Sequence, residues 1–304
     1  MGYDCIVCVK QVPDTANITG DVMNEDGTVN RAALPTVFNP EDLHALEAAL
    51  RIRDAYGGSV TVLTMGPPNA SDTLRESLFR GADRVLLLTD RRAAGSDTLA
   101  TSYILSQAIK KIERYDLVFC GRQAIDGDTA QVGPQLAEKL GIPQVTYFER
   151  IVALDEVKAR VRRNVGNGWE IVETPLPALF TVLDTANTPA PPAARRVMRY
   201  KRALTAYEVA KGVAAEMPDA DAEGRDGETA RRVEQLTMND LLIEQWDLDF
   251  IKADMQWCGL AGSPTKVHRV QSIVLTKEGF TEVPPTEQGV RDMMHELIVD
   301  HTFG

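Results

Sequence analysis

Short hydrophobic runs alternate with amphipathic stretches through the first half of the chain. The apolar runs predict four buried strands, at residues 5–9, 60–65, 84–88 and 117–120. Apolar residues recur at helical spacing in the stretches between and after them, which predicts helices at 40–56, 70–79, 97–111 and 129–140. Such regular alternation of strand and helix is typical of a doubly wound, mostly parallel α/β sheet.

The next segment of the chain has a different pattern. Three stretches look like antiparallel strands, at 145–154, 158–165 and 169–173. Asn167-Gly168 is a good hairpin signal between the last two. A further apolar run at 178–183 is followed by a proline-rich stretch, 188–192, which cannot continue a sheet. We therefore expect an antiparallel extension on the parallel sheet.

The C-terminal third has weaker signals. Residues 216–232 are rich in Asp, Glu, Gly and Ala, which predicts a solvated linker. From Leu236 to Gly304 the apolar pieces are short, and no core of their own is evident. This part is expected to be an extended C-terminal arm that packs on a partner protein.

Composition excludes several classes of function. The net charge is −11 and no basic patch is visible, which argues against a non-specific nucleic-acid binder. No apolar run approaches the length of a membrane span, and the N-terminus lacks the basic region of a secretory signal. Four cysteines in 304 residues do not make a disulfide framework, so reduced thiols in the cytoplasm are expected.

Three segments follow the carboxyl ends of predicted parallel strands, where such sheets usually bind ligands: 8–13, 64–67 and 121–134. The last joins a strand to a helix N-terminus, whose free N–H groups and dipole favour a phosphate. Gly127 and Gly133 would let the backbone approach a ligand, and Asp126 and Asp128 could cap the helix or accept from a ribose hydroxyl. Glycine and aspartate content alone slightly favours a mere tight strand–helix connection.

Several separate segments, taken in order, resemble one protein family. They are 8–14 (CVKQVPD), Asn39-Pro40, Gly66-Pro67, 81–83 (GAD) and 121–134. Together they resemble the β subunit of electron-transfer flavoproteins over roughly residues 3–205. Residues 259–267 resemble the C-terminal segment of that family, whereas about 207–235 do not match clearly.

This resemblance implies a heterodimer with a larger α subunit, which holds most of one FAD. The β subunit would be a nucleotide-binding α/β domain, 1–205, followed by a linker and arm, 206–304, packing on the α subunit. It would bind a second nucleotide, which is structural AMP in simple members. In electron-bifurcating members it is a second FAD, which takes a hydride from NADH. One electron then goes to a low-potential ferredoxin or flavodoxin, and one through the partner's FAD to an acceptor dehydrogenase or quinone reductase.

The resemblance also implies which residues bind the second nucleotide. They are Cys8, Val9, Lys10, Asn39, Thr64, Met65, Gly66, Thr98, Thr101, Gly121, Arg122, Asp126, Gly127, Asp128, Thr129, Ala130, Gln131, Val132 and Gly133. Because the flavin would carry the redox chemistry, no catalytic acid or base is expected from the protein, and no metal site.

The loop resembles the bifurcating version of the family. Simple members usually have an Asn-Gln-Thr-like run that grips a terminal phosphate, where this chain has Ala130-Gln131-Val132. Thr98 and Thr101 are three apart in a predicted first helical turn, so both hydroxyls can face one ligand, although ordinary helix capping explains them equally well. The alternatives are a simple electron carrier with AMP, or a non-redox module that binds an adenine nucleotide.

Overall fold

The structure is a computed structural model that describes residues 2–14, 34–265 and 282–299. They belong to two compact units. The first comprises residues up to 18 and 31–268, and the second comprises 19–30 and 269–304. Within the second unit the described part contains helix α8 (Glu287–Val299), which has no buried residue. None of the helices in the described parts is long and apolar enough to cross a membrane.

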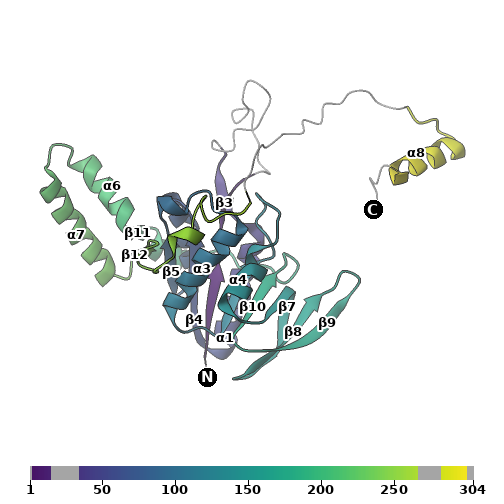
Figure 1. Ribbon diagram of the computed structural model, residues 1–304, viewed down its shortest axis with the longest axis horizontal. Coiled ribbons are helices and arrows are strands. Elements are labelled where there is room, and N and C mark those ends of the chain that lie inside the picture. The colour runs from purple at the N-terminus through teal and green to yellow at the C-terminus, as the bar shows by residue number, and fades with distance from the viewer. Residues whose placement is uncertain (1, 15–33, 266–281, 300–304) are drawn as a thin grey trace. The chain divides into compact units, whose positions relative to one another are not determined.

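A ten-stranded sheet forms the centre of the first unit, in the order β11-β12-β5-β4-β1-β6-β10-β7-β8-β9 (Figure 1). In this order, neighbouring strands from β11 to β7 pair in parallel. Strand β8 pairs antiparallel with both β7 and β9. Their bounds are β1 Tyr3–Cys8, β4 Gly58–Met65, β5 Arg84–Leu88, β6 Leu117–Gly121, β7 Gln144–Leu154, β8 Lys158–Asn164, β9 Trp169–Pro175, β10 Ala178–Val182, β11 Leu204–Thr205 and β12 Leu242–Trp246. The predicted fold class, a mostly parallel α/β sheet with an antiparallel extension, is confirmed.

Helices cover both faces of this sheet. The face with α1 and α2 contains one buried apolar cluster, and the face with α3 and α4 contains the other. These helices are α1 Pro40–Tyr56, α2 Ser71–Arg80, α3 Thr98–Ile112 and α4 Val132–Leu140. Alternation along β1 places Cys5 in the first cluster and Cys8 in the second, as the two-residue period of a strand predicts.

Strand order reverses at β1. The chain proceeds from β1 to β4 and β5 on one side, and then returns to β6 and β10 on the other. In open α/β sheets such a switch point leaves a crevice at the carboxyl ends of the strands, and ligands bind there. The smaller elements around it are β2 (Gln11–Pro13), β3 (Thr36–Phe38), and three short 3-10 helices, η2 Pro68–Ala70, η3 Arg91–Ala93 and η4 Met255–Trp257.

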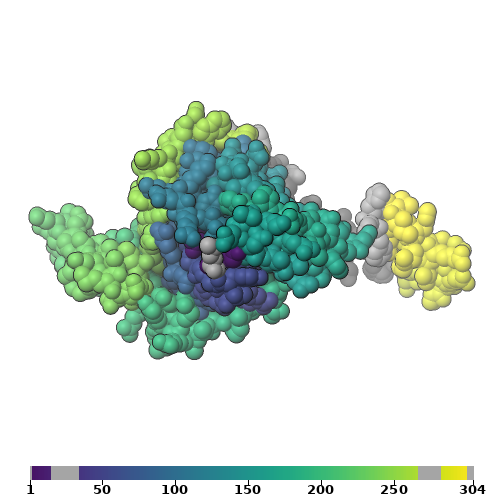
Figure 2. All heavy atoms as spheres, turned by 90° about the horizontal axis from the view of Figure 1, so that it is seen from below, coloured from purple at the N-terminus to yellow at the C-terminus, as the bar shows by residue number. Residues whose placement is uncertain are grey.

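The linker expected at 216–232 is instead part of a helical hairpin. Helix α6 (Ala206–Glu216) begins with a capping box between Thr205 and Glu208, and α7 (Ala222–Met238) packs against it. Figures 1 and 2 show this hairpin at the β11–β12 edge of the sheet, beyond the short helix α5 (Ala194–Tyr200) in sequence. The linker interpretation was wrong because α7 buries no residue, so its sequence lacks an apolar stripe. Ion pairs of Glu228 with Arg231 and Arg232 support it instead.

The expectation that the chain after Leu236 has no core of its own was also wrong for its first part. Strand β12 pairs in parallel with β5 inside the main sheet. Ile243, Trp246, Leu248 and Ile251 are at most 8% exposed. Their burial therefore comes from this chain rather than from a partner. Residues 266–281 and 300–304 lie outside the described residues, and contact of α8 with a partner stays a prediction.

Candidate functional site

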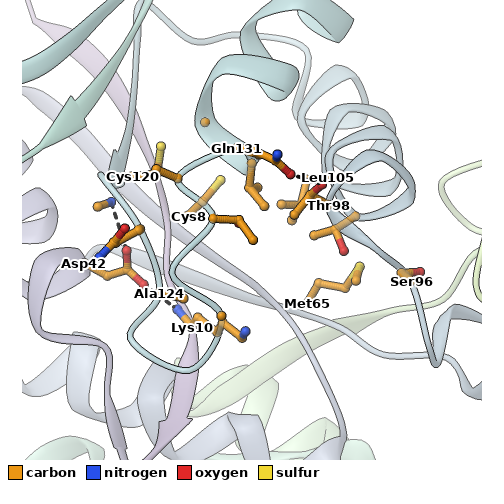
Figure 3. Close-up of a pocket in the computed structure, with 18 of the residues that line it drawn as sticks. Cys8, Lys10, Asp42, Met65, Ser96, Thr98, Leu105, Cys120, Ala124 and Gln131 are labelled. Carbon is orange, nitrogen blue, oxygen red and sulfur yellow. Dashed lines mark hydrogen bonds between the residues drawn. The ribbon is translucent and has the colours of Figure 1, made fainter. Parts of the chain in front are cut away.

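A cavity of about 410 Å³ lies at the carboxyl ends of β1, β4 and β6, where the strand order reverses. A volume of this size is typical of cofactor and ligand sites. In Figure 3, Asp42, Lys10 and Ala124 lie on one side of the cavity. Met65, Ser96, Thr98 and Leu105 lie on the other side, Cys8 lies between, and Cys120 lies above Asp42.

Most of the predicted nucleotide residues line this cavity. They are Cys8, Val9, Lys10, Met65, Thr98, Thr101, Gly121, Arg122, Gly127, Thr129, Ala130, Gln131, Val132 and Gly133. Five others lie nearby but are not part of its lining: Asn39, Thr64, Gly66, Asp126 and Asp128. Gly66 lies instead in a neighbouring cavity of about 330 Å³, which shares Met65 and Ala93 with the first. Thr64 is buried and donates its hydroxyl to the Val9 carbonyl at 2.7 Å.

The loop before α4 lines the cavity and has an unusual backbone conformation. Asp128 and Ala130 have φ angles of 49° and 52°, in the left-handed region, and Gln131 returns to the right-handed region. Alternation of this kind turns successive N–H groups toward one point and forms an anion-binding concavity. The helix dipole of α4 adds to it. The same two residues explain why α4 begins at Val132 rather than at Thr129 as predicted.

Asp126 and Asp128 do not cap α4, contrary to expectation. The Lys10 ammonium donates to the Asp126 carboxylate and lies 2.8 Å from each of its two oxygens. Asp128 accepts from the Gln123 amide at 3.0 Å. Gln131 is the N-cap and makes no side-chain capping hydrogen bond. Both aspartates therefore brace the loop.

Residues at the N-terminus of α1 hold the same loop through hydrogen bonds. The Asn39 side chain donates to the Gln123 carbonyl at 2.9 Å and accepts from the Ile125 N–H at 3.1 Å. Glu41 accepts from the Gln123 N–H at 2.8 Å and pairs with Arg122 at 2.9 Å. The Nε of Arg122 is buried and has no hydrogen-bond partner among the described residues.

Helix α3 brings two hydroxyl groups to the opposite wall. Asp97 caps this helix by accepting from the Ala100 N–H at 2.9 Å. Thr98 and Thr101 both line the cavity, as their spacing predicts. The Thr98 hydroxyl donates to the Gln131 side chain at 2.9 Å, which joins the first turn of α3 to that of α4.

The segment before residue 266 braces this wall, which no sequence pattern indicated. The Ser263 hydroxyl accepts from the Asp97 N–H at 2.8 Å, and the Thr265 N–H donates to the Asp97 carboxylate at 2.9 Å. Gly259 donates its N–H to Ser96. Burial opposes ionisation of Asp97, but the N–H donors of Ala100 and Thr265 outweigh it and hold its pKa below the usual value. The carboxylate is therefore charged at neutral pH.

An added side chain would have different surroundings at Gly127 and at Gly133, the two glycines of the loop. Gly127 is an exposed residue of the cavity lining, and a Cβ there would meet no atom within 4 Å. A Cβ at Gly133 would lie 2.7 Å from Thr181 and 2.9 Å from Cys120. Gly133 is therefore needed for the packing of α4 on β6 and β10, whatever the cavity binds. Gly133 also lines the cavity, so its role in the approach of a ligand stays a prediction.

The cysteines in the cavity floor are not reactive. Burial raises the pKa of Cys8 to about 12, and it raises that of Cys120 well above its ordinary value. The thiols are therefore protonated and act as small apolar groups. The described residues contain no cluster of three or more His, Cys, Asp or Glu side chains that could hold a metal ion. The cavity thus offers N–H donors, two hydroxyls, cationic groups and an apolar wall.

The comparisons with known proteins agree with this geometry. The profile of the electron transfer flavoprotein domain matches residues 26–222. The chain is 39% identical over 296 residues to the electron transfer flavoprotein subunit beta of Clostridium acetobutylicum, covering 97% of this chain and 98% of the relative. The chain belongs to the electron-transfer flavoprotein family, among its β subunits.

Other β-subunit relatives are equally similar. Protein FixA of Azorhizobium caulinodans is 42% identical over 295 residues, covering 95% of this chain and 91% of FixA. The caffeyl-CoA reductase-Etf complex subunit CarD of Acetobacterium woodii is 41% identical over 265 residues, 87% of this chain and 86% of CarD. As an electron-transfer flavoprotein β subunit, the chain is an electron-transfer protein that acts with an α subunit.

Proposed function

We propose that this β subunit belongs to an electron-bifurcating flavoprotein of the cytoplasm, and that its cavity holds a second FAD. NADH is the electron donor. A low-potential ferredoxin or flavodoxin accepts one electron, and an acceptor dehydrogenase or quinone reductase accepts the other through the FAD of the α subunit. Bound at this site, the flavin would supply hydride acceptance from NADH and one-electron transfer.

The extent of the cavity carries this proposal. It continues from the N–H groups before α4, across the cavity floor, to Met65, Leu105, Thr98 and Thr101. A nucleotide that ended in one phosphate at the loop would leave this second wall uncovered. A pyrophosphate that continues to a flavin would place an aromatic ring system against Met65 and Leu105, and its polar edge near the two hydroxyls.

The residues present fit such a group. The N–H concavity at Ala130 and Gln131, the Lys10 ammonium and the unpaired Nε of Arg122 are suited to a pyrophosphate. Thr101 would donate to a ring oxygen or nitrogen atom, and the Thr98 hydroxyl, which donates to Gln131, would accept from a ring N–H. Each such hydrogen bond contributes about 1 kcal/mol net. These residues bind and orient the cofactor, and no side chain of the cavity is assigned a proton-transfer step.

The name of one relative supports the choice of acceptor. CarD is named as a subunit of a complex of an Etf with caffeyl-CoA reductase. A dehydrogenase-type acceptor that works in a complex with the heterodimer is therefore part of the proposal. Simple electron transfer with AMP in the same cavity is the second candidate function, because the loop and the N–H groups would bind either nucleotide.

Replacing Ala130 by Asn together with Val132 by Thr should shift the site from FAD toward AMP. Residue 130 is in the left-handed region, which Asn adopts more readily than Ala, so the loop conformation is preserved. Residues 130 and 132 both line the cavity, so the new amide and hydroxyl would be placed to bind a terminal phosphate. The measurement is the FAD and AMP content of the purified heterodimer after mild denaturation, for which we expect about two FAD before and a rise in AMP after the change.

Val165→Thr is a matched control, because this half-exposed hairpin residue makes the same change far from the cavity. It should leave both nucleotides at the unmutated level. One FAD and one AMP in the unmutated heterodimer would contradict the proposed function. Unchanged nucleotide content in the double variant would show that residues 130–132 do not discriminate.

A further inference from the structure

One side chain of the cavity joins the ends of two neighbouring strands, and the sequence did not single it out. Asp42, in the first turn of α1, is 5% exposed. Its Oδ2 accepts from the Lys10 N–H at 2.8 Å, and its Oδ1 accepts from the Gly121 N–H at 2.9 Å. Strands β1 and β6 pair up to Cys8 and Cys120, so both N–H groups lie where the two strands separate around the cavity.

Only a carboxylate can make both contacts fully. Two N–H donors point at two different oxygen atoms, and a carboxylate accepts at each. A protonated acid or an amide presents a donor toward one of these N–H groups and leaves it without a good acceptor. A buried N–H group in that position is costly, so the two strand ends would move or one would admit water.

Few charged groups near Asp42 could neutralise the negative charge of its carboxylate. Glu41 is its neighbour on α1, and its carboxylate is paired with Arg122. From β1 and β6 it faces the thiols of Cys8 and Cys120, which are protonated. Asp42 accepts from the backbone N–H of Lys10, but the ammonium of Lys10 is paired with Asp126. Among the hydrogen bonds and ion pairs of the described residues, Asp42 therefore has no direct cationic partner.

Burial moves the pKa of Asp42 toward neutral pH. Burial raises its pKa to about 7, against the opposing effect of hydrogen bonds from Gly121, Asn39 and Lys10 and with a further rise from Glu41. The charged form therefore predominates only above neutral pH.

We propose that Asp42 is a positioning residue that holds the ends of β1 and β6 at the separation a bound nucleotide requires, and that it does so only as a carboxylate. Nucleotide retention then falls when Asp42 takes up a proton. This inference rests on the proposed function only in that the cavity binds an adenine nucleotide, and it holds for FAD or AMP.

Stability and nucleotide retention should respond to pH in opposite directions. The pKa of Asp42 is higher in the folded protein than in the unfolded chain, so its contribution to folding is present below the unfolded value and is lost as pH rises through about 7. Retention, by contrast, should increase over the same interval. A residue that merely stabilised the fold would change both in the same direction.

The experiment measures release of FAD and AMP from the heterodimer by dialysis between about pH 6 and 8, together with thermal unfolding at each pH. We expect retention in the unmutated protein to rise with pH. Asp42→Asn should release nucleotide at least about tenfold more readily at the upper pH and should lose this pH dependence. Glu47→Gln is the matched control, because Glu47 is a buried acid on the same helix that accepts from Arg51 and Ala190 away from the cavity.

Three results would overturn the inference. They are retention that falls as pH rises, an Asp42→Asn protein with the unmutated retention and pH profile, and a Glu47→Gln protein that loses nucleotide equally. The pH profile of the unmutated heterodimer needs no variant, so the test survives a variant that fails to fold. If nucleotide is present but is AMP, the bifurcating function fails while this inference stands, and a cavity that holds no nucleotide overturns both.

Discussion

Ending the chain after Asn239 is expected to unfold the α/β domain itself rather than only weaken its binding to a partner. The deletion removes β12 and the buried side chains of Ile243, Trp246, Leu248 and Ile251. Burial of such side chains contributes about 1.5–3 kcal/mol each. Their sum is comparable to the whole stability of an ordinary domain, about 5–15 kcal/mol. Circular dichroism should therefore show no cooperative thermal transition.

A chain that ends after residue 281 is the matched control. It keeps every buried residue of the first unit and removes α8, which buries none in the described structure. Its melting temperature should equal that of the full chain, whereas its affinity for the α subunit should fall. If the chain that ends after Asn239 showed a cooperative transition at the melting temperature of the full chain, β12 would not be part of the folding unit.

Replacing Gly127 by Val should remove the nucleotide of the β subunit and leave the fold intact. A Cβ at this position meets no protein atom within 4 Å, so the side chain is accommodated without strain on its neighbours. Because Gly127 lines the cavity, the new side chain would lie beside the space that we propose holds the phosphate. Overpacking of a close contact costs about 1–3 kcal/mol, so affinity should fall by about tenfold or more. Nucleotide content and melting temperature are the two measurements.

Gly168→Val provides the control, since a Cβ added to this hairpin glycine also meets no atom within 4 Å and lies outside the cavity. It should keep full nucleotide content. Gly133→Val should instead lower the melting temperature, because the added atoms meet Thr181 and Cys120. Full occupancy in the Gly127 variant would contradict the position of the nucleotide against this loop.

The parallel part of the fold followed from the sequence because its strands and helices carry strong hydrophobic periodicity. Helix α7 was missed for the opposite reason: its side chains are all at least partly exposed, and only its capping by Asp221 and its ion pairs mark it. Strand β12 is five residues long, and its pairing with β5 joins segments about 160 residues apart in sequence. Such a contact leaves no local pattern.

The lining of the cavity was largely predicted, but the residues that position it were not. Glu41 and Asp42 stand in a first helical turn, where acidic residues are common because they favour the helix dipole. Their actual partners, Gly121 and Gln123, come from a loop about 80 residues away. The ion pair of Asp126 with Lys10 joins residues 116 apart in sequence. Tertiary hydrogen bonds of this kind follow only from the fold.

Anaerobic titration of the purified heterodimer with NADH, followed by its visible absorption spectrum, tests the central claim most directly. If the cavity of this β subunit holds a second FAD, two flavins per heterodimer should be present and NADH should bleach both, because hydride enters at the β-subunit flavin and electrons pass on to the other. A heterodimer with one flavin that NADH does not reduce would contradict the claim. It would leave a simple electron carrier with AMP in this cavity.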